Sequence, residues 1–217
     1  MAPRPRITMC AASTIDGRIA TRGGDSALSS PEGLALLHRL RASHDAVLVG
    51  RGTVDADDPS LTVRLARGRT GSRIILDPSG TLPSGSRVVR TCRSTRTIVA
   101  TTSRASGRDR RRLADAGAEV VVAGRARISL PALLRRLPPM GISSVLVEGG
   151  GRTNWEFASR GLYDELLLEV CPVMAGSSGS VPLLRGEGPA RLAGAPRARL
   201  LGTRRLGRSV LLRYAKD

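Results

Sequence analysis

Short runs of apolar residues alternate with helical patterns through residue 160. Continuous apolar or β-branched runs, which are typical of strands buried on both faces, occur at 7–12, 46–49, 73–76, 97–101, 120–122 and 144–148. Apolar residues spaced three or four apart predict helices between them, at about 31–42, 107–117, 129–137 and 153–160. Strands that alternate with helices form a parallel sheet covered by helices, so the pattern predicts an α/β fold.

The last fifty residues follow a different pattern. Runs at 166–173, 200–204 and 209–214 predict three strands with no helix between them. Strands joined without a crossover helix pair in an antiparallel manner, so we expect this tail to complete one edge of the sheet. Neither an internal repeat nor a linker divides the sequence, and residues 1–217 are therefore predicted to form a single domain.

Basic residues outnumber acidic ones by 35 to 18, which gives a net charge of +17 and raises the possibility of nucleic-acid binding. Every basic residue except Lys216 is an arginine, and the arginines are spread along the whole chain. Four aromatic residues are too few to form a platform for stacked bases. We therefore expect a basic enzyme, with a nucleic-acid-binding protein as the distant alternative.

Cysteine and histidine are sparse. Cys10, Cys92 and Cys171 lie far apart without a C-x-x-C pair, and the two histidines are His38 and His44. This pattern indicates neither a disulfide framework nor a metal centre. No apolar stretch approaches the roughly 18 residues of a membrane span, and the first residues are too polar for a secretory signal. We expect a cytoplasmic protein that binds no metal and no membrane.

Three glycines follow the predicted strand 144–148 directly and precede a predicted helix. Gly149, Gly150 and Gly151 permit a tight turn, and the start of the helix offers free N–H groups to a phosphate. The spacing is not the dinucleotide fingerprint G-x-G-x-x-G, because Asn154 stands at the last position. The residues alone leave two interpretations, a phosphate-binding loop and a purely structural turn.

A second glycine-containing junction, 50–53, follows the predicted strand 46–49 and leads to three carboxylates, Asp55, Asp57 and Asp58. One interpretation is a helix end and a turn, since Asp58 precedes a proline. A second is a metal site. The third is a ligand-contact loop, because α/β proteins bind ligands at the carboxyl ends of their strands.

Five motifs occur in order along the chain: S-T-I-D-G-R-I-A-T at 13–21, G-D-S at 24–26, S-S-P-E at 29–32, H-D-A-V-L-V-G-R-G-T-V-D-A-D-D-P-S-L-T-V-R at 44–64, and E-G-G-G at 148–151. In this order they resemble the reductase domain of riboflavin biosynthesis, found as the C-terminal half of a bifunctional deaminase–reductase and as stand-alone proteins. The resemblance implies a three-layer, dihydrofolate-reductase-like fold with a mostly parallel central sheet. The deaminase's zinc signature, H-x-E with P-C-x-x-C, is absent from the sequence, so we expect a reductase without a deaminase domain.

The resemblance also implies an activity. The family uses NADPH to reduce the ribosylamino group of a diaminopyrimidinone or aminouracil 5′-phosphate to a ribitylamino group, by hydride transfer to C1′ of the opened ribose. An alternative is a reductase on the same scaffold that acts on dihydrofolate, on a pterin-like ring or on a substrate of a specialised pathway. A homodimer is implied by the resemblance alone.

Site residues are carried over residue by residue. The resemblance implies cofactor contacts at Ala12, Thr53 and Asp57. It implies further cofactor contacts in the glycine-rich loop, which extends to Glu156 and includes Gly149, Gly150, Gly151, Arg152 and Thr153. It implies substrate contacts at Ser26, Arg41, Leu61, Arg64 and Glu148. Arginine forks suit phosphate, so we expect Arg41 and Arg64 to clamp the 5′-phosphate of the substrate. We expect the polar cluster after strand 97–101 to bind the 2′-phosphate of NADPH through Thr101, Thr102, Ser103 and Arg104.

The proton donor is left open by the residues. Of the carboxylates in the motifs we nominate Asp57 and Glu148 as the catalytic candidates, and water is the alternative. The chain departs from the family at Leu28, where the family usually has an aromatic residue in a segment one residue longer. This departure leaves room for a shifted cofactor, another substrate or a role in a specialised pathway.

Overall fold

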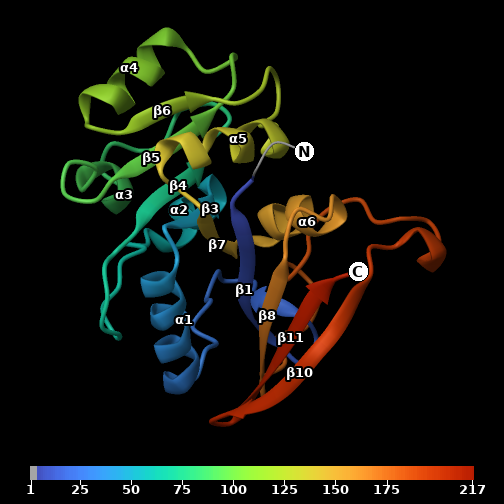
Figure 1. The fold of residues 1–217 in the computed structure, drawn as a ribbon. Helices are drawn as coiled ribbons and strands as arrows, with labels where there is room; N and C mark the ends of the chain where they lie inside the picture. The colour runs from blue at the N-terminus through green and yellow to red at the C-terminus, as the bar shows by residue number, and fades with distance from the viewer. Residues whose placement is uncertain (1–3) are drawn as a thin grey trace.

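The computed structural model describes residues 4–217, in which a nine-stranded sheet is the central element (Figure 1). From one edge to the other its strands are β10 (Ala198–Leu206), β11 (Ser209–Lys216), β8 (Glu165–Cys171), β1 (Arg6–Thr14), β7 (Ser144–Gly149), β3 (Ala46–Gly50), β4 (Ser72–Leu76), β5 (Thr97–Thr101) and β6 (Glu119–Val122). The strands from β8 to β6 are parallel, whereas β11 is antiparallel to β8 and β10 is antiparallel to β11. The predicted α/β fold, with a mostly parallel sheet and antiparallel C-terminal strands, is confirmed.

Helices cover both faces of this sheet and make three layers (Figure 1). Successive side chains of a strand point to opposite faces, so each strand contributes to two separate cores. One core lies under α5 (Leu130–Arg136) and α6 (Gly151–Ser159). The other face is covered by α1 (Pro31–Ser43), α2 (Arg51–Asp57), α3 (Arg87–Arg90) and α4 (Gly107–Asp115).

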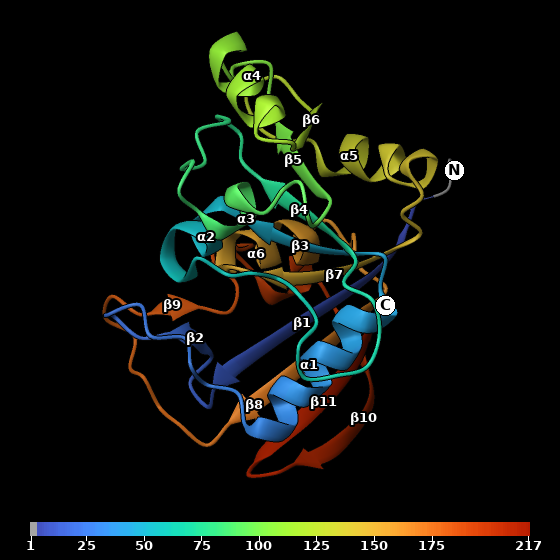
Figure 2. The same ribbon diagram turned by 90° about the vertical axis from the view of Figure 1, so that its left-hand side faces the viewer.

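Short elements complete the chain. The strands β2 (Arg18–Ala20) and β9 (Val181–Pro182) pair as a separate two-stranded sheet near the end of β1 (Figure 2). Single 3₁₀ turns lie at η1 (Pro138–Met140) and η2 (Leu192–Gly194). None of the helices in residues 4–217 is long and apolar enough to cross a membrane.

The predicted antiparallel tail is confirmed, because β8, β11 and β10 pair antiparallel and complete one edge of the sheet. On its other side β8 is parallel to β1. The reason is helix α6, which lies between β7 and β8 in the sequence. This crossover carries the chain past β1, so β8 enters the sheet in the same direction as its neighbour.

The central strands β1 and β7 separate before they end. Their pairing stops at Met9 and Val147, while β1 continues beside β8 to Thr14 and β7 continues to Gly149. Figure 2 shows the two strands diverging toward the end that carries α2. We call this divergence the fork. It lies at the carboxyl ends of parallel strands, where α/β proteins bind their ligands.

Candidate active site

A buried ion pair lies at the fork. Glu148 is near the end of β7, and a register shift against β3 leaves it as the extra residue of a bulge. Arg41 of α1 reaches it with two parallel bonds, from Nε to Oε1 and from Nη2 to Oε2, both 2.6 Å long. The side chains are only 9% and 10% exposed. A bidentate pair of this kind fixes both side chains in one orientation.

This pair changes what Arg41 can do. Its Nη1 donates to the carbonyl of Thr62 at 3.1 Å, so three of the five N–H groups of the guanidinium have partners within the protein. Burial lowers the pKa of Arg41, but the hydrogen bond and charge of Glu148 outweigh burial and raise it overall. Arg41 therefore stays charged and holds Glu148, and little of its fork remains for a phosphate.

Arg64 is placed differently. Its guanidinium is exposed and donates to the hydroxyls of Ser60 and Thr62 in its own loop. Among residues 4–217, no carboxylate lies within ion-pair distance of it. An oriented arginine without an acidic partner is suited to an external anion. Arg64 is therefore the better candidate of the two predicted phosphate ligands.

Leu61, another predicted substrate contact, has its side chain in the core and is 3% exposed. Its backbone has φ +54°, a left-handed conformation that is uncommon for leucine. The buried side chain anchors the loop before Arg64. Any contact of Leu61 with a substrate must therefore come from its backbone.

Arg73, which is 1% exposed in β4, was not among the predicted site residues. It donates to the carbonyls of Ser60, Val88 and Thr95 and to the hydroxyls of Thr91 and Thr97. Burial lowers its pKa. The contact with Ser60 ties the loop before Arg64 to the sheet. A fully buried arginine cannot be told from a surface one by sequence pattern in a chain this rich in arginine.

The three carboxylates after β3 have different partners. Asp55 pairs with Arg51 at 3.0 Å, and Asp58 accepts a bond from the backbone of Arg87. Asp57 instead accepts a bond from the hydroxyl of Ser26 at 3.3 Å. Within residues 4–217, no three His, Cys, Asp or Glu side chains are grouped as metal ligands. Asp55 and Asp57 belong to the short helix α2 and Asp58 ends it, and Asp57 is the one that meets another predicted site residue.

The surroundings of Asp57 raise its pKa. Partial desolvation raises its pKa, although the hydrogen bond from Ser26 works in the opposite direction. A carboxyl group with a raised pKa keeps its proton to higher pH, as a proton donor must. Asp57 therefore combines two properties expected of a catalytic acid, a raised pKa and a position beside the predicted substrate residue Ser26.

The glycine-rich turn lies on the β7 side of the fork. Gly149 and Gly150 have φ of +82° and +81°, which only glycine adopts without strain. A Cβ on Gly150 would lie 2.9 Å from the hydroxyl of Thr53, and that hydroxyl donates to the carbonyl of Gly149 at 3.2 Å. The turn thus lies close against the start of α2, and any side chain would fill the space above it.

Helix α6 begins at Gly151, two residues earlier than predicted, and no side chain caps it. The N–H groups of Gly151, Arg152 and Thr153 have no acceptor within the helix, because the first helical bond runs from Asn154 to Gly150. Uncapped amides and the positive end of the helix dipole attract phosphate. The open turn and the free amides fit a dinucleotide pyrophosphate.

The polar cluster after β5 is only partly available. Thr101 is fully buried and its hydroxyl has no hydrogen-bond partner, while Thr102 donates to the carbonyl of Pro78 at 2.7 Å. Ser103 and Arg104 are exposed. Of the four residues predicted to bind a 2′-phosphate, these two are accessible. An unpartnered buried hydroxyl at the same strand end is consistent with a group that completes the site.

Arg51, which was not predicted as a site residue, begins α2 at the carboxyl end of β3. It donates to the hydroxyl of Ser79, which follows β4, at 3.1 Å and pairs with Asp55. Ala12, on the β1 side of the fork, is half-buried and paired in register with Glu169. The predicted cofactor residues therefore lie along one end of the parallel strands, at the carboxyl ends of β1, β7, β3, β4 and β5.

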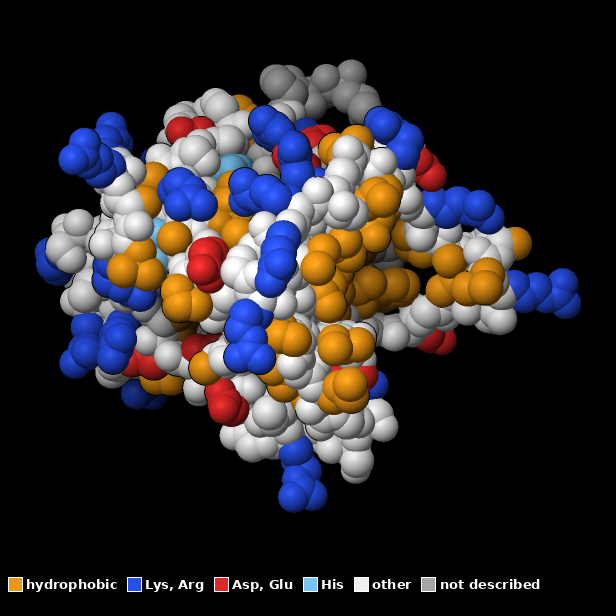
Figure 3. Space-filling view, turned by 90° about the horizontal axis from the view of Figure 1, so that it is seen from below, with side chains coloured by type: hydrophobic (Ala, Val, Ile, Leu, Met, Phe, Trp, Pro, Cys, Tyr) orange, Lys and Arg blue, Asp and Glu red, His pale blue; other side chains and the backbone are white. Residues whose placement is uncertain are grey.

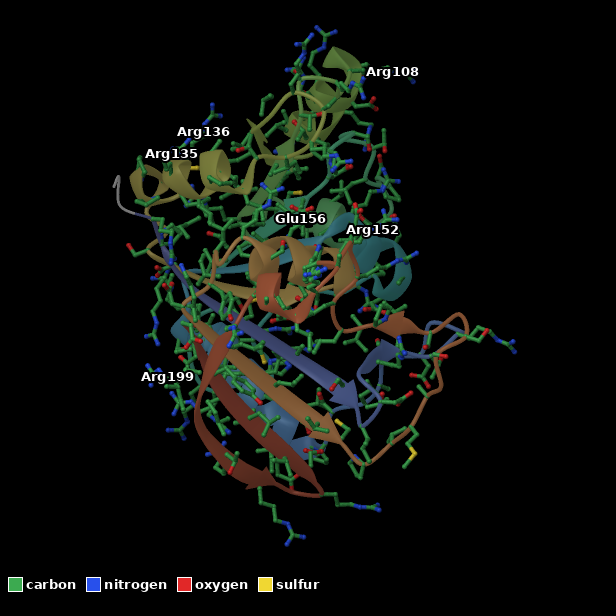
Figure 4. All side chains as sticks on the ribbon, turned by 90° about the vertical axis from the view of Figure 1, so that its right-hand side faces the viewer. Arg108, Arg135, Arg136, Arg152, Glu156 and Arg199 are labelled. Atoms are coloured by element: carbon green, nitrogen blue, oxygen red, sulfur yellow. The ribbon has the colours of Figure 1, made fainter. Side chains whose placement is uncertain are left out.

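Several of the remaining arginines lie apart on the periphery of the molecule. Figure 4 shows Arg108 on α4, Arg135 and Arg136 on α5 and Arg199 on β10 at separate points of the periphery, pointing away from the sheet. Figure 3 shows basic side chains separated by hydrophobic and uncharged surface on the face it draws. This dispersion does not favour a nucleic-acid interface, which needs its charge along one stripe or patch.

The chain is similar to known proteins over nearly its whole length. Residues 5–212 match the family model of the RibD C-terminal domain. The protein named 2,5-diamino-6-ribosylamino-4(3H)-pyrimidinone 5′-phosphate reductase from Methanothermobacter thermautotrophicus is 37% identical over 214 residues, which cover 97% of this chain and 98% of that protein. The protein of the same name from Aquifex aeolicus is 37% identical over 190 residues, which cover 85% and 84%.

A solved structure leads to the same family. RibD of Acinetobacter baumannii superposes with a TM-score of 0.84 and 27% identity over 99% of this chain. The match covers 58% of the Acinetobacter chain, so this chain spans little more than half of that protein. With the family match over residues 5–212 and the two reductases at 37% identity, the chain belongs to the RibD C-terminal domain family of riboflavin-biosynthesis reductases.

Proposed function

We propose that this protein reduces the ribosylamino group of an aminopyrimidine ribose 5′-phosphate to a ribitylamino group, with NADPH as the reductant. The observation that carries the proposal is the fork. The end of β7 carries Glu148, held by Arg41, directly before the open glycine turn and the uncapped start of α6. The same Arg41 holds the loop of Arg64 through the carbonyl of Thr62. This arrangement suits two phosphorylated ligands that meet between β1 and β7.

The cofactor side uses backbone groups. The amides of Gly151, Arg152 and Thr153 would hold the pyrophosphate, and Ser103 with Arg104 would meet the 2′-phosphate. Bound NADPH supplies a hydride for C1′ of the opened ribose. Ala12 on β1 and Thr53, which lies against the glycine turn, would orient the ring that carries the hydride.

The substrate side uses side chains. Arg64 would bind the 5′-phosphate, and the carboxylate of Glu148, held by Arg41, would accept hydrogen bonds from ribose hydroxyls. When C1′ of an imine receives the hydride, the C=N double bond becomes single and its nitrogen takes a proton. Asp57 would donate that proton, with Ser26 fixing the orientation of its carboxyl group.

Two further properties belong to this proposal. The chain would act as one reductase domain without a deaminase activity, and it would form a homodimer. Leu200 and Leu201 on the edge strand β10 are 51% and 44% exposed. An edge strand with exposed leucines is a natural surface for a second copy of the chain.

The function is tested by measuring NADPH oxidation by the purified protein with the deaminated and the non-deaminated ribosylaminopyrimidine 5′-phosphates in parallel. We expect turnover with one of the two and clearly lower turnover with NADH. Dihydrofolate serves as the substrate of the alternative reductase. Turnover of dihydrofolate alone would replace the proposed substrate, and the absence of any NADPH binding would refute the enzyme assignment.

Replacing Arg64 with glutamine tests the phosphate contact. We expect the KM for the phosphorylated substrate to rise about 30- to 100-fold, because charged hydrogen bonds to phosphate contribute roughly 1.5–3 kcal/mol. The kcat should stay within about threefold. Steady-state kinetics measure both constants. The matched control is Arg67→Gln, which changes an exposed arginine of the same loop and should leave the KM unchanged. An equal effect of Arg64→Gln on the dephosphorylated substrate would contradict this role.

Replacing Asp57 with asparagine tests the proton donor. A general acid acts in its protonated form, so the wild-type kcat should fall as pH rises through the raised pKa of Asp57. Asp57→Asn should lower kcat about 100-fold and remove this decline, because asparagine carries no transferable proton. A pH profile of kcat measures both effects. Asp55→Asn, on the same short helix, is the control and should keep the wild-type profile. An undiminished kcat in Asp57→Asn would assign the proton to water.

A further inference from the structure

His38 of α1 is buried, with 3% of its surface exposed. Its Nδ1 lies 2.9 Å from the backbone nitrogen of Arg64. A backbone N–H can only donate, so Nδ1 must be the unprotonated nitrogen of the ring and the proton must be on Nε2. The contact reaches the backbone of the residue whose guanidinium we assign to the substrate phosphate.

The segment from Ser60 to Arg64 has few other attachments to the core. Arg73 holds the carbonyl of Ser60 at 3.3 Å, and Arg41 holds the carbonyl of Thr62 at 3.1 Å. Leu61 between them has φ +54°. Since the left-handed region is unfavourable for leucine, these attachments must maintain the conformation of the segment. His38 provides the attachment at Arg64 itself.

Protonation of His38 would break this contact. An imidazolium donates from both nitrogens, so its Nδ1–H would oppose the N–H of Arg64. The charged groups that face the ring are Arg41 on the same helix and Arg64 on the covering loop, and both are cations. Burial first, and then Arg41 and Arg64, lower the pKa of His38 below its ordinary value of 6.5. The ring is therefore neutral near pH 7.

The same shift affects stability. Because the folded protein binds this proton less readily than the unfolded chain does, the free energy of unfolding decreases as pH falls below 6.5. The contribution is complete above that pH. Protonation of His38 at acid pH therefore lowers the free energy of unfolding and also breaks the contact that holds the loop at Arg64.

We propose that His38 is a positioning residue that holds the Ser60–Arg64 segment in its phosphate-binding conformation, and that it does so only as the neutral imidazole. The role rests on the proposed function in one respect, the assignment of Arg64 to the substrate phosphate. It does not require His38 to touch the substrate. It predicts an acid limit on substrate affinity that is separate from the chemistry of hydride transfer.

Two substitutions test separately the hydrogen-bond acceptor of His38 and the titration of its ring. His38→Asn keeps a side-chain oxygen that can accept from the N–H of Arg64 but does not titrate near neutral pH. His38→Leu removes the acceptor at similar size. At about pH 8, His38→Leu should raise the KM for the phosphorylated substrate about tenfold with kcat within about twofold, while His38→Asn should stay near wild type. An unchanged KM in His38→Leu would overturn the proposal.

The pH profile of KM distinguishes positioning from a purely structural role. The substrate phosphate also titrates near pH 6, but it does so identically for every variant. We expect the KM of the wild type to rise more steeply toward about pH 5 than that of His38→Asn. His44→Asn, at the other histidine, should keep the wild-type profile. The same acid-side rise in His38→Asn as in the wild type would overturn the neutral-imidazole role.

Two measurements do not depend on turnover. The chain has two histidines, so nitrogen-15 NMR of the wild type and of His38→Asn assigns both rings. We expect His38 as the Nε2–H tautomer with a titration midpoint below 6.5, and an Nδ1–H tautomer would refute the contact. Calorimetry with ribose 5-phosphate should show about tenfold weaker binding to His38→Leu. If these results hold without reductase turnover, the proposed function fails and the role of His38 stands.

Discussion

Arg41→Met is expected to lower the free energy of unfolding by about 3–5 kcal/mol and to abolish measurable reductase activity. The substitution leaves the carboxylate of Glu148 buried without its two 2.6 Å bonds, and an unpaired buried charge is strongly destabilising. Equilibrium denaturation in urea and steady-state kinetics measure the two effects. The activity is lost because Glu148 no longer has a fixed orientation.

The double variant Arg41→Met/Glu148→Leu separates stability from function. Replacing a buried ion pair with apolar side chains of similar size is often neutral or stabilising, so most of the lost free energy should return. Activity should not return, since the carboxylate is gone. Arg160→Met, which breaks an exposed pair with Glu156, is the control and should cost less than about 0.5 kcal/mol. Full activity in the double variant would remove Glu148 from the substrate site.

Gly150→Val is expected to weaken NADPH binding at least about 100-fold. A side chain at φ +81° is strained, and its Cβ would lie 2.9 Å from the hydroxyl of Thr53. The turn would move away from α2 together with the start of α6, and the free amides of α6 would lose their alignment with a pyrophosphate. Fluorescence titration with NADPH measures the affinity, and a thermal melt shows whether the variant folds.

Two companion variants make this result interpretable. Gly52→Ala, in α2 nearby, places its Cβ in open space and should keep wild-type affinity. Gly150→Ala introduces the smallest side chain at the strained position and should show an intermediate loss. Unchanged NADPH affinity in a folded Gly150→Val would show that the cofactor does not lie on this turn.

The elements that could be predicted are those whose own residues show a local pattern of apolar or helix-capping residues. The continuous apolar run 46–49 is a strand buried on both faces, and the serine, proline and glutamate at 30–32 begin α1. Helix α2 carries no such pattern, because Val54 is its only buried residue and Gly50 gives it no side-chain cap. Its position depends on contacts such as that of Thr53 with Gly149, which lies 96 residues away. Contacts at that separation leave no local pattern.

The same distinction applies to the site. Arg41, in the predicted helix 31–42, and Arg64, at the end of the motif 44–64, look alike in the sequence, and both were predicted to bind phosphate. The structure separates them, because Arg41 pairs with Glu148, 107 residues away, while Arg64 has only hydroxyl partners. His38 was visible only as a histidine in a predicted helix. Its contact with the backbone of Arg64 depends on how the loop packs against that helix.

The fork also determines how the two parts of the sheet cohere. Four residue pairs, from Arg6 with Ser144 to Met9 with Val147, join the block β10-β11-β8-β1 to the block β7-β3-β4-β5-β6. A ligand that touches both Ala12 and Gly149 bridges the blocks where the backbone ladder is missing. Ligand present at 100 times its dissociation constant stabilises a fold by about 2.7 kcal/mol. In this protein that stabilisation acts across the junction of the two blocks, so a bound ligand is expected to hold together the strands β1 and β7 beyond Met9 and Val147, where their pairing stops.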